Sequence, residues 1–128
     1  MRLLLDTHVF LWLQDEPERV SSTAREWCES GDSELFLSMG SIWEMQIKLG
    51  RGKLHLKMPL AQLIDEQCRE NNLQILGVKL SHLWALGGLA FHHGDPFDRL
   101  LIAQALEEGL HLVSADRAFV DYPANILW

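Results

Sequence analysis

Long apolar runs and cysteine motifs are missing from this sequence. The first apolar stretch, Leu3–Leu5, is broken at Asp6, so we expect neither a secretory signal peptide nor a membrane span. The only two cysteines, Cys28 and Cys68, lie far apart, with no CxxC pair and no histidine at ligand spacing. We expect ordinary thiols rather than a zinc site or redox motif. Together these absences predict a cytoplasmic protein that does not bind membranes.

Positive charge is also scarce. The chain has 11 Lys and Arg residues against 18 Asp and Glu residues, which gives a formal net charge of −7. Domains that bind nucleic acid through bulk positive charge usually carry a basic surplus that replaces counterions on the phosphates. This sequence is not of that class, so any contact with a polyanion has to be local or mediated by a metal ion.

Enough apolar residues are present to build a hydrophobic core. Of the 128 residues, 48% are hydrophobic and 23% are charged, which is typical of a folded chain and excludes a disordered one. The length is in the usual range of one domain. We therefore expect a single domain over residues 1–128.

Short apolar runs alternate with stretches of helical periodicity, the pattern of βαβ units around a parallel sheet. The runs that predict strands are 2–5, 34–37, 73–76, 111–113 and 125–127. Serine caps, a proline in a first turn and closing glycines predict the helices between them. These helices begin at Ser21 or Ser22, at Ser38 or Ser41, at Pro59, at Ser81 and at Asp95. The sequence predicts an α/β fold with a central parallel sheet.

Four acids fall where such a sheet binds ligands. Asp6 directly follows the first predicted strand, Glu44 comes shortly after the second, and Asp116 follows the strand at 111–113. Asp98 lies in the first turn of the helix that begins at Asp95. Because ligands of parallel α/β sheets gather at the carboxyl ends of the strands, we expect these carboxylates to converge.

Each acid near a strand end also has a structural interpretation. Asp6 or Thr7 could cap the helix after the first strand, and Ser114 with Asp116 could cap a short helix over 115–119. For either position alone, structure and function are equally favoured. The choice depends on whether the acids act together.

The two acids on helices have similar alternatives. Glu44 forms a sequence-level capping box with Ser41 and stands four residues before Lys48, the spacing of a solvated ion pair. Asp95 and Asp98 match an N-cap and its third helical position. Of this pair, we expect Asp95 to be the cap and Asp98 the ligand.

Four carboxylates at one edge would repel one another unless a cation were present. A hard divalent ion such as Mg²⁺ prefers oxygen ligands, and a second ion could use the remaining carboxylates. Such a centre suits phosphodiester hydrolysis, because the ion lowers the pKa of an attacking water and neutralises charge on the phosphate. The combination of acids therefore indicates a metal-dependent nuclease.

Four stretches of the chain resemble a known family. They are LLLDTHVFLW at 3–12, SIWEMQIKLGRGKL at 41–54, HHGDPFDRLLIAQALEEG at 92–109 and LVSADRAF at 112–119. In this order they resemble the PIN-domain ribonucleases, specifically the VapC-type toxins of bacterial toxin–antitoxin pairs. The segment DPFDRLLIAQA is the most specific of the motifs.

The resemblance implies a fold, an activity and partners. The fold would be a PIN-like three-layer α/β/α sandwich with a central parallel sheet. The activity would be that of an endoribonuclease dependent on Mg²⁺ or Mn²⁺, with RNA as substrate. The chain would bind a cognate antitoxin. It would assemble as a homodimer or as a toxin–antitoxin hetero-oligomer.

The resemblance also places the site on particular residues. Matched position by position, the catalytic and metal-binding acids are Asp6, Glu44, Asp98 and Asp116. Thr7 and Ser114 would be neighbouring hydroxyls that orient a ligand or water. Asp95 belongs to the same motif without having to bind metal.

Other residues were weighed for a role at the site. His92 and His93 are adjacent, and since consecutive side chains rarely face the same ion, we assign neither a function. The apolar run Phe10–Leu13 is too wide for one buried face and predicts a partner surface. A group of basic residues either binds phosphate or forms an ordinary solvated surface; its members are Lys48, Arg51, Lys53, Lys57, Arg99 and Arg117.

Two alternatives to a nuclease remain open. A receiver-like binding module also gathers acids at strand ends, but it needs a pair of acids after the first strand, where this chain has Asp6 and Thr7. A catalytically silent PIN-like scaffold is less favoured because all four acids are present. Metal-dependent cleavage of a mixed RNA pool would distinguish these readings.

Overall fold

One parallel sheet of five strands forms the centre of the molecule. The computed structural model describes all 128 residues. The strands are β1 (Arg2–Leu5), β2 (Glu34–Ser38), β3 (Gln74–Leu76), β4 (His111–Val113) and β5 (Ile126–Leu127), in the spatial order β3-β2-β1-β4-β5. Each lies within one residue of its predicted bounds. The central strand β1 is apolar on both faces, as expected for a strand covered on both sides.

Helices fill the connections. They are α1 (Thr7–Asp15), α2 (Ser22–Glu29), α3 (Met39–Gly50), α4 (Leu60–Glu70), α5 (Leu80–Gly87) and α6 (Pro96–Glu108). Short 3-10 helices form at η1 (Pro17–Arg19) and η2 (Arg117–Asp121). Where the sequence left two caps open, the structure uses Ser21 for α2 and Ser38 for α3. α6 ends at Gly109, whose positive φ of 65° favours glycine.

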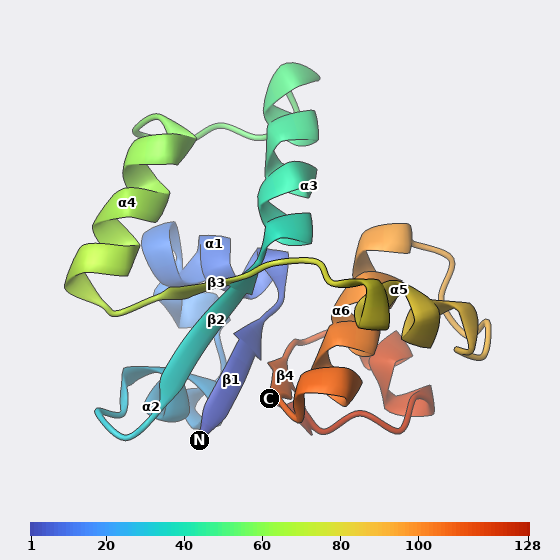
Figure 1. Cartoon of the computed structure of the whole chain (residues 1–128). Coiled ribbons are helices and arrows are strands. Elements are labelled where there is room, and N and C mark those ends of the chain that lie inside the picture. Colours follow the sequence, from blue (N-terminus) through green and yellow to red (C-terminus); the bar gives the residue numbers. More distant parts are fainter.

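The helices cover both faces of the sheet, which makes three layers (Figure 1). On one face, Leu3, Leu5 and Leu37 pack with residues of α1, α2 and α4. On the other face, Leu4 and Leu112 pack against α6 and η2. Alternate leucines of β1 therefore serve opposite layers, and the predicted α/β/α sandwich is confirmed.

The chain changes direction across the sheet beside β1. It moves outward from β1 through β2 to β3, then crosses back to place β4 and β5 on the other side of β1. In parallel α/β sheets, such a switch point leaves a crevice outside the carboxyl ends of the strands. Asp6 and Ser114 directly follow the two strands that flank this point, β1 and β4.

The predicted partner surface at Phe10–Leu13 is wrong. Phe10 is only 1% exposed, and the three residues after it are half-buried against the same core. Large exposed apolar side chains occur instead on α3 and α5, where Trp43 is 64% exposed and Trp84 is 72% exposed. None of the helices has the length and apolar character needed to cross a membrane.

Both cysteines are free thiols, as predicted. Cys28 is buried in the core between α2 and the sheet, and burial raises the pKa of its thiol to about 11. A thiol with such a raised pKa is unreactive near neutral pH because very little thiolate forms.

Candidate active site

Asp6 is both a helix cap and a buried carboxylate. It follows β1, caps α1 by accepting the amide hydrogen of His8 at 2.8 Å, and accepts the hydrogen of the Ser114 hydroxyl at 2.7 Å. Burial raises the pKa of Asp6, but the hydrogen bonds from His8 and Ser114 outweigh it, so the pKa lies below its ordinary value. The structure therefore holds Asp6 as an anion.

Glu44 is linked to the start of α1 through a hydroxyl. It is buried on α3, and the hydroxyl of Thr7 donates to its Oε1 at 2.8 Å. Lys48 Nζ lies 2.9 Å from Oε2, so the predicted ion pair exists, although Glu44 is buried rather than solvated. The predicted capping box with Ser41 does not form, because α3 begins three residues earlier, and the buried Ser41 hydroxyl has no hydrogen-bond partner.

Asp95 and Asp98 divide the two roles at the start of α6. Asp95 is the N-cap, and it accepts the amide hydrogens of Phe97 at 2.8 Å and Asp98 at 3.0 Å. The side chain of Asp98 does not cap the helix. Burial, together with the charges of Asp95, Asp6 and Glu44, raises the pKa of Asp98 to about 7.

Asp116 completes the acidic edge and is linked to Asp6. It caps η2 by accepting the amide hydrogen of Ala118 at 2.9 Å, so the predicted short helix has Asp116 as its cap. Ser114 Oγ accepts the amide hydrogen of Asp116 at 3.1 Å while it donates to Asp6. One hydroxyl thus connects the two acids that follow β1 and β4.

A cavity of about 360 Å³ opens between these acids. Asp6, Asp98 and Asp116 line it together with His8 and four further residues, Val9, Trp12, Arg19 and Ala115. Glu44 does not line it but reaches the same region through Thr7. A larger cavity of about 430 Å³ lies between α1, α2, α4 and the starts of β2 and β3, and Glu29 is its only carboxylate. The acidic side chains are therefore concentrated in the smaller cavity.

Two histidines of this region were missed by the sequence reasoning. His93 was assigned no role, yet its Nε2 lies 3.2 Å from Asp98 Oδ2 and 3.1 Å from Asp116 Oδ2. His8 was not considered as a site residue, and its hydrogen bond to Asp6 raises the pKa of the imidazole. The available signal was proximity in sequence, since each histidine lies two residues from a helix-capping acid, Asp6 or Asp95.

Arg99 is not available to bind phosphate, contrary to its place among the predicted basic contacts. Its guanidinium is buried, donates to the Ala90 carbonyl at 2.9 Å and to the Tyr122 hydroxyl at 3.3 Å, and stacks under the Phe91 ring. Arg99 therefore fixes the loop before α6. Arg117 is exposed.

The donor set fits a hard divalent cation. Ligand atoms of His93, Asp98 and Asp116 lie within 4.8 Å of one another, and Asp6 faces the same cavity. Carboxylate oxygens are the preferred ligands of Mg²⁺ and Mn²⁺. Burial first and then the charges of the neighbouring acids raise the pKa of Asp98, and a bound cation would offset both effects by stabilising the ionised carboxylate.

This chain is similar to known proteins over most of its length. The family model of the PIN domain matches residues 3–125. Ribonuclease VapC22 of Mycobacterium tuberculosis is 31% identical over 116 residues, which cover 90% of this chain and 87% of that protein.

Similar solved structures share the fold. One is VapBC2 from Rickettsia felis bound to a DNA fragment from its promoter, with a TM-score of 0.67 and 15% identity. Another is DNA-bound VapBC from Salmonella typhimurium, with a TM-score of 0.67 and 19% identity. Each covers 98% of this chain and 96% of the matched chain. With the family match and the full-length relative, the chain belongs to the PIN-domain family, in its VapC branch.

Proposed function

We propose that this protein is a metal-dependent endoribonuclease toxin that hydrolyses RNA phosphodiester bonds and is neutralised by a cognate antitoxin in the cytoplasm. The observation that carries the proposal is the convergence of Asp6, Asp98 and Asp116 on one cavity, with Glu44 behind it. The similarity to a ribonuclease over most of the chain supports the reaction class. The receiver-like alternative has no support from the family match.

The acids would hold Mg²⁺ or Mn²⁺. Asp6, Asp98 and Asp116 face the cavity, and Glu44 lies close enough for its charge to raise the pKa of Asp98. When bound, the ion would lower the pKa of an attacking water and neutralise charge that grows on the phosphate. The chain itself supplies fixed geometry, because Ser114 holds Asp6 and Thr7 holds Glu44 by hydrogen bonds shorter than 3 Å.

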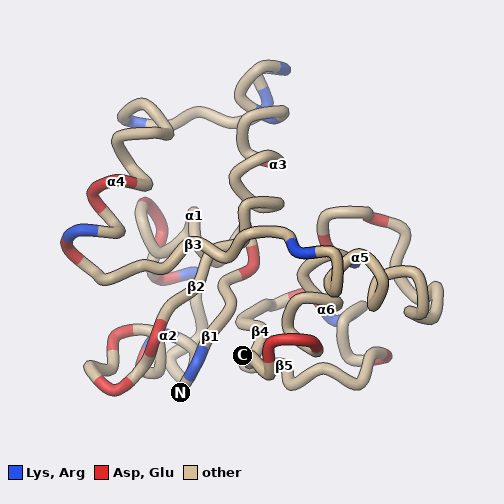
Figure 2. The backbone as a smooth tube through the Cα atoms, in the orientation of Figure 1, with Lys and Arg blue, Asp and Glu red and all other residues tan.

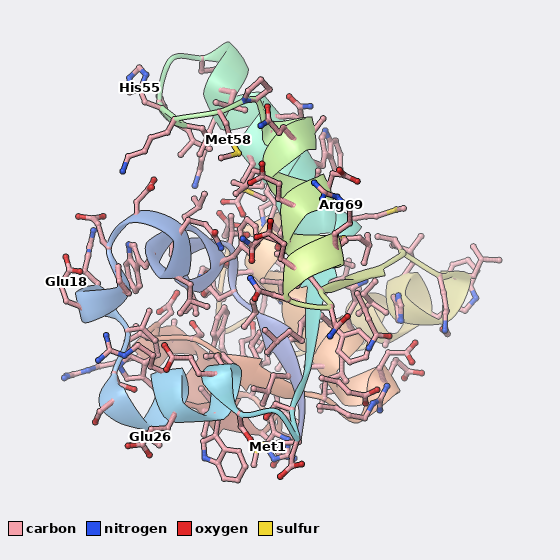
Figure 3. All side chains as sticks on the ribbon, turned by 90° about the vertical axis from the view of Figure 1, so that its left-hand side faces the viewer. Met1, Glu18, Glu26, His55, Met58 and Arg69 are labelled. Carbon is pink, nitrogen blue, oxygen red and sulfur yellow. The ribbon has the colours of Figure 1, made fainter.

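Local positive charge would compensate for the acidic surface when RNA binds. Lys48, Arg51, Lys53 and Lys57 lie in a stretch from 45 to 64 that contains no acid. Figure 2 shows these positions at the end of α3 and in the connection to α4. His55 projects from the same connection, away from the body of the molecule (Figure 3). Lys48 lies 2.9 Å from Glu44, so the basic segment begins beside one of the acids and would contact the RNA backbone as it leaves the site.

A salt titration tests the basic segment. Arg51 and Lys53 are exposed, so replacing both with Gln should leave the fold unchanged. Each lost phosphate contact should reduce the slope of log affinity against log salt by about 0.7 for single-stranded RNA. Arg69→Gln on α4 is the matched control, since it removes an exposed cation elsewhere. Equal slopes for all proteins would exclude the segment from RNA binding.

A protein partner would have apolar surface available on α3 and α5. Met39 and Trp43 on α3, and Leu80 and Trp84 on α5, are all more than half exposed. Apolar patches of this kind mark protein interaction sites. They support an antitoxin or a second copy as partner, in place of the run at Phe10–Leu13, which is buried or half-buried.

Cleavage of a mixed RNA pool by the purified chain tests the enzymatic part. We expect cleavage with Mg²⁺ or Mn²⁺ and none with a chelator, and sequencing of the fragment ends would give the cleavage motif. Asp98→Asn should be inactive, whereas Glu108→Gln, a carboxylate at the other end of α6, should be active. Absence of cleavage with either ion would leave a catalytically silent PIN-like module as the better description.

A further inference from the structure

The hydrogen bonds of His93 indicate which of its two ring nitrogens carries the hydrogen. The backbone N–H of Asp95 donates to Nδ1 at 3.1 Å. An amide nitrogen can only donate, so Nδ1 holds a lone pair and the hydrogen of the ring lies on Nε2. Nε2 then donates to Asp116 Oδ2 at 3.1 Å, and it lies 3.2 Å from Asp98 Oδ2, close enough to attract that carboxylate.

This arrangement argues against His93 as a metal ligand. A ligating Nε2 needs its lone pair, so the hydrogen would have to move to Nδ1. It would then point at the N–H of Asp95, and two donors would face each other. We propose that His93 is a positioning residue, which holds Asp98 and Asp116 together through Nε2–H and leaves metal binding to the carboxylates. The proposal rests on the function proposed above.

The loop before α6 is anchored so that the ring cannot turn away. The hydroxyl of Tyr122 accepts the amide hydrogens of His92 at 3.0 Å and His93 at 2.9 Å. Arg99 donates to the same hydroxyl, and the ring of Phe119 lies 5.6 Å from that of His93, centroid to centroid. Both the backbone and the ring of His93 are therefore fixed by residues outside the loop.

The contacts of His93 with two acids fix the position of one carboxylate relative to the other. Asp98 belongs to α6 and Asp116 is the N-cap of η2, and His93 lies within 3.2 Å of both carboxylates. His93 sets the separation of their Oδ2 atoms before any cation arrives. Outer partners of this kind orient metal ligands, and their loss typically lowers metal affinity about 10- to 100-fold.

Two substitutions separate donation from ligation. His93→Gln places an amide N–H near the position of Nε2, whereas His93→Asn reaches only the position of Nδ1. Calorimetric titration of the full chain with Mn²⁺ should show affinity close to wild type for Gln and a loss of about 10- to 100-fold for Asn. Loss of affinity by both variants, with both still folded by circular dichroism, would overturn the proposal. Wild-type affinity in both would overturn it as well.

The imidazole nitrogen chemical shifts, measured by NMR, provide a readout that does not depend on activity. We expect the Nε2–H form of His93 in the metal-free chain and the same form after addition of Mg²⁺. A change to the Nδ1–H form on adding Mg²⁺ would show that Nε2 becomes a ligand and would overturn the proposal. If wild type binds no Mn²⁺ and cleaves no RNA, the proposed function fails, while the metal-free tautomer still tests the hydrogen-bond assignment.

Discussion

At each end of α6, a histidine from outside the helix lies beside a carboxylate of the helix, and the surroundings shift the pKa values of the two carboxyls in opposite directions. At the start, His93 contacts Asp98, whose pKa is raised to about 7. At the end, His82 lies 2.8 Å from Glu108, and hydrogen bonds from His82 and Lys79 lower the pKa of that carboxyl. A histidine–carboxylate pair therefore does not by itself distinguish the candidate site at the start of α6 from the ion pair at its end.

The difference lies in the balance of charge. Glu108 receives donors from both His82 and Lys79, and no second acid shares them. His93 is shared by two acids in a region where burial and three further carboxylates oppose ionisation of Asp98. The end of α6 is satisfied by the chain alone, whereas its start would be stabilised by an added cation. A surplus of negative charge thus separates a candidate site from a structural ion pair.

The largest expected effect is on catalysis. Asp98→Asn removes a proposed ligand, so RNA cleavage should fall by more than the roughly 100-fold typical of a lost outer partner. Glu108→Gln at the other end of α6 is the matched control and should retain activity per folded molecule. Initial cleavage rates at saturating Mg²⁺ measure both. Similar rates for the two variants would remove the functional distinction between the ends.

Substitution at the Glu108 end of α6 should affect the stability of the fold rather than catalysis. Glu108→Ala leaves the fully buried His82 without its acceptor, which should destabilise the fold by about 2 kcal/mol. Glu107→Ala, at the neighbouring exposed position, should change stability by less than about 0.5 kcal/mol. Urea unfolding measures both differences. A loss below 0.5 kcal/mol for Glu108→Ala would show that the pair is not structural.

The pH dependence of stability should distinguish the two carboxyls. The pKa of Asp98 in the folded chain, about 7, lies above its ordinary 3.8, so between about pH 4 and 7 only the native state keeps the proton. Stability therefore falls as the pH rises through this window. Glu108 has a lowered pKa, so its contribution is present above its ordinary 4.5 and is lost as the pH falls through the folded value.

Urea unfolding in a chelator, from pH 3 to 8, tests these signs. Asp98→Asn should gain stability over wild type as the pH rises from 4 to 7, reaching about 1 to 2 kcal/mol with allowance for solvent screening. Glu108→Gln should lose stability relative to wild type above about pH 4.5, and the difference should shrink in acid. Parallel curves for Asp98→Asn and wild type would contradict the raised pKa.

The sequence was sufficient for the sheet and the acidic edge. Apolar runs bounded by turn residues predicted all five strands, because a parallel strand covered on both faces needs a continuous apolar run. Four acids could be placed at one edge because parallel strands share a direction. That inference brought Asp6, Asp98 and Asp116 to one cavity and left only Glu44 set back behind Thr7.

Other features depended on geometry that periodicity does not contain. Only one of the two adjacent histidines contacts the acids, since His93 lies beside Asp98 and Asp116 whereas the ring of His92 packs against Tyr122. The sequence offered no means of choosing between them. Arg99 could have been placed correctly, since consecutive helical residues point about 100° apart and Arg99 directly follows Asp98. The apolar run from Phe10 gave no indication of its burial, because α2 and α4, whose residues share its core cluster, lie elsewhere in the sequence.

The smallest expected effect tests the charge balance at the start of α6 without removing a ligand. Asp95→Asn keeps a cap, because an Asn oxygen can accept the amide hydrogens of Phe97 and Asp98, so stability should change by only a few tenths of a kcal/mol. It also removes the charge that, after burial, contributes most to the raised pKa of Asp98. The pKa of Asp98, followed by NMR in the metal-free chain, should therefore move down, while cleavage at saturating Mg²⁺ changes little. Complete loss of Mn²⁺ binding in this variant would show that Asp95 is itself a ligand, and an unchanged pKa of Asp98 would show that the surplus of charge does not arise at this end of the helix.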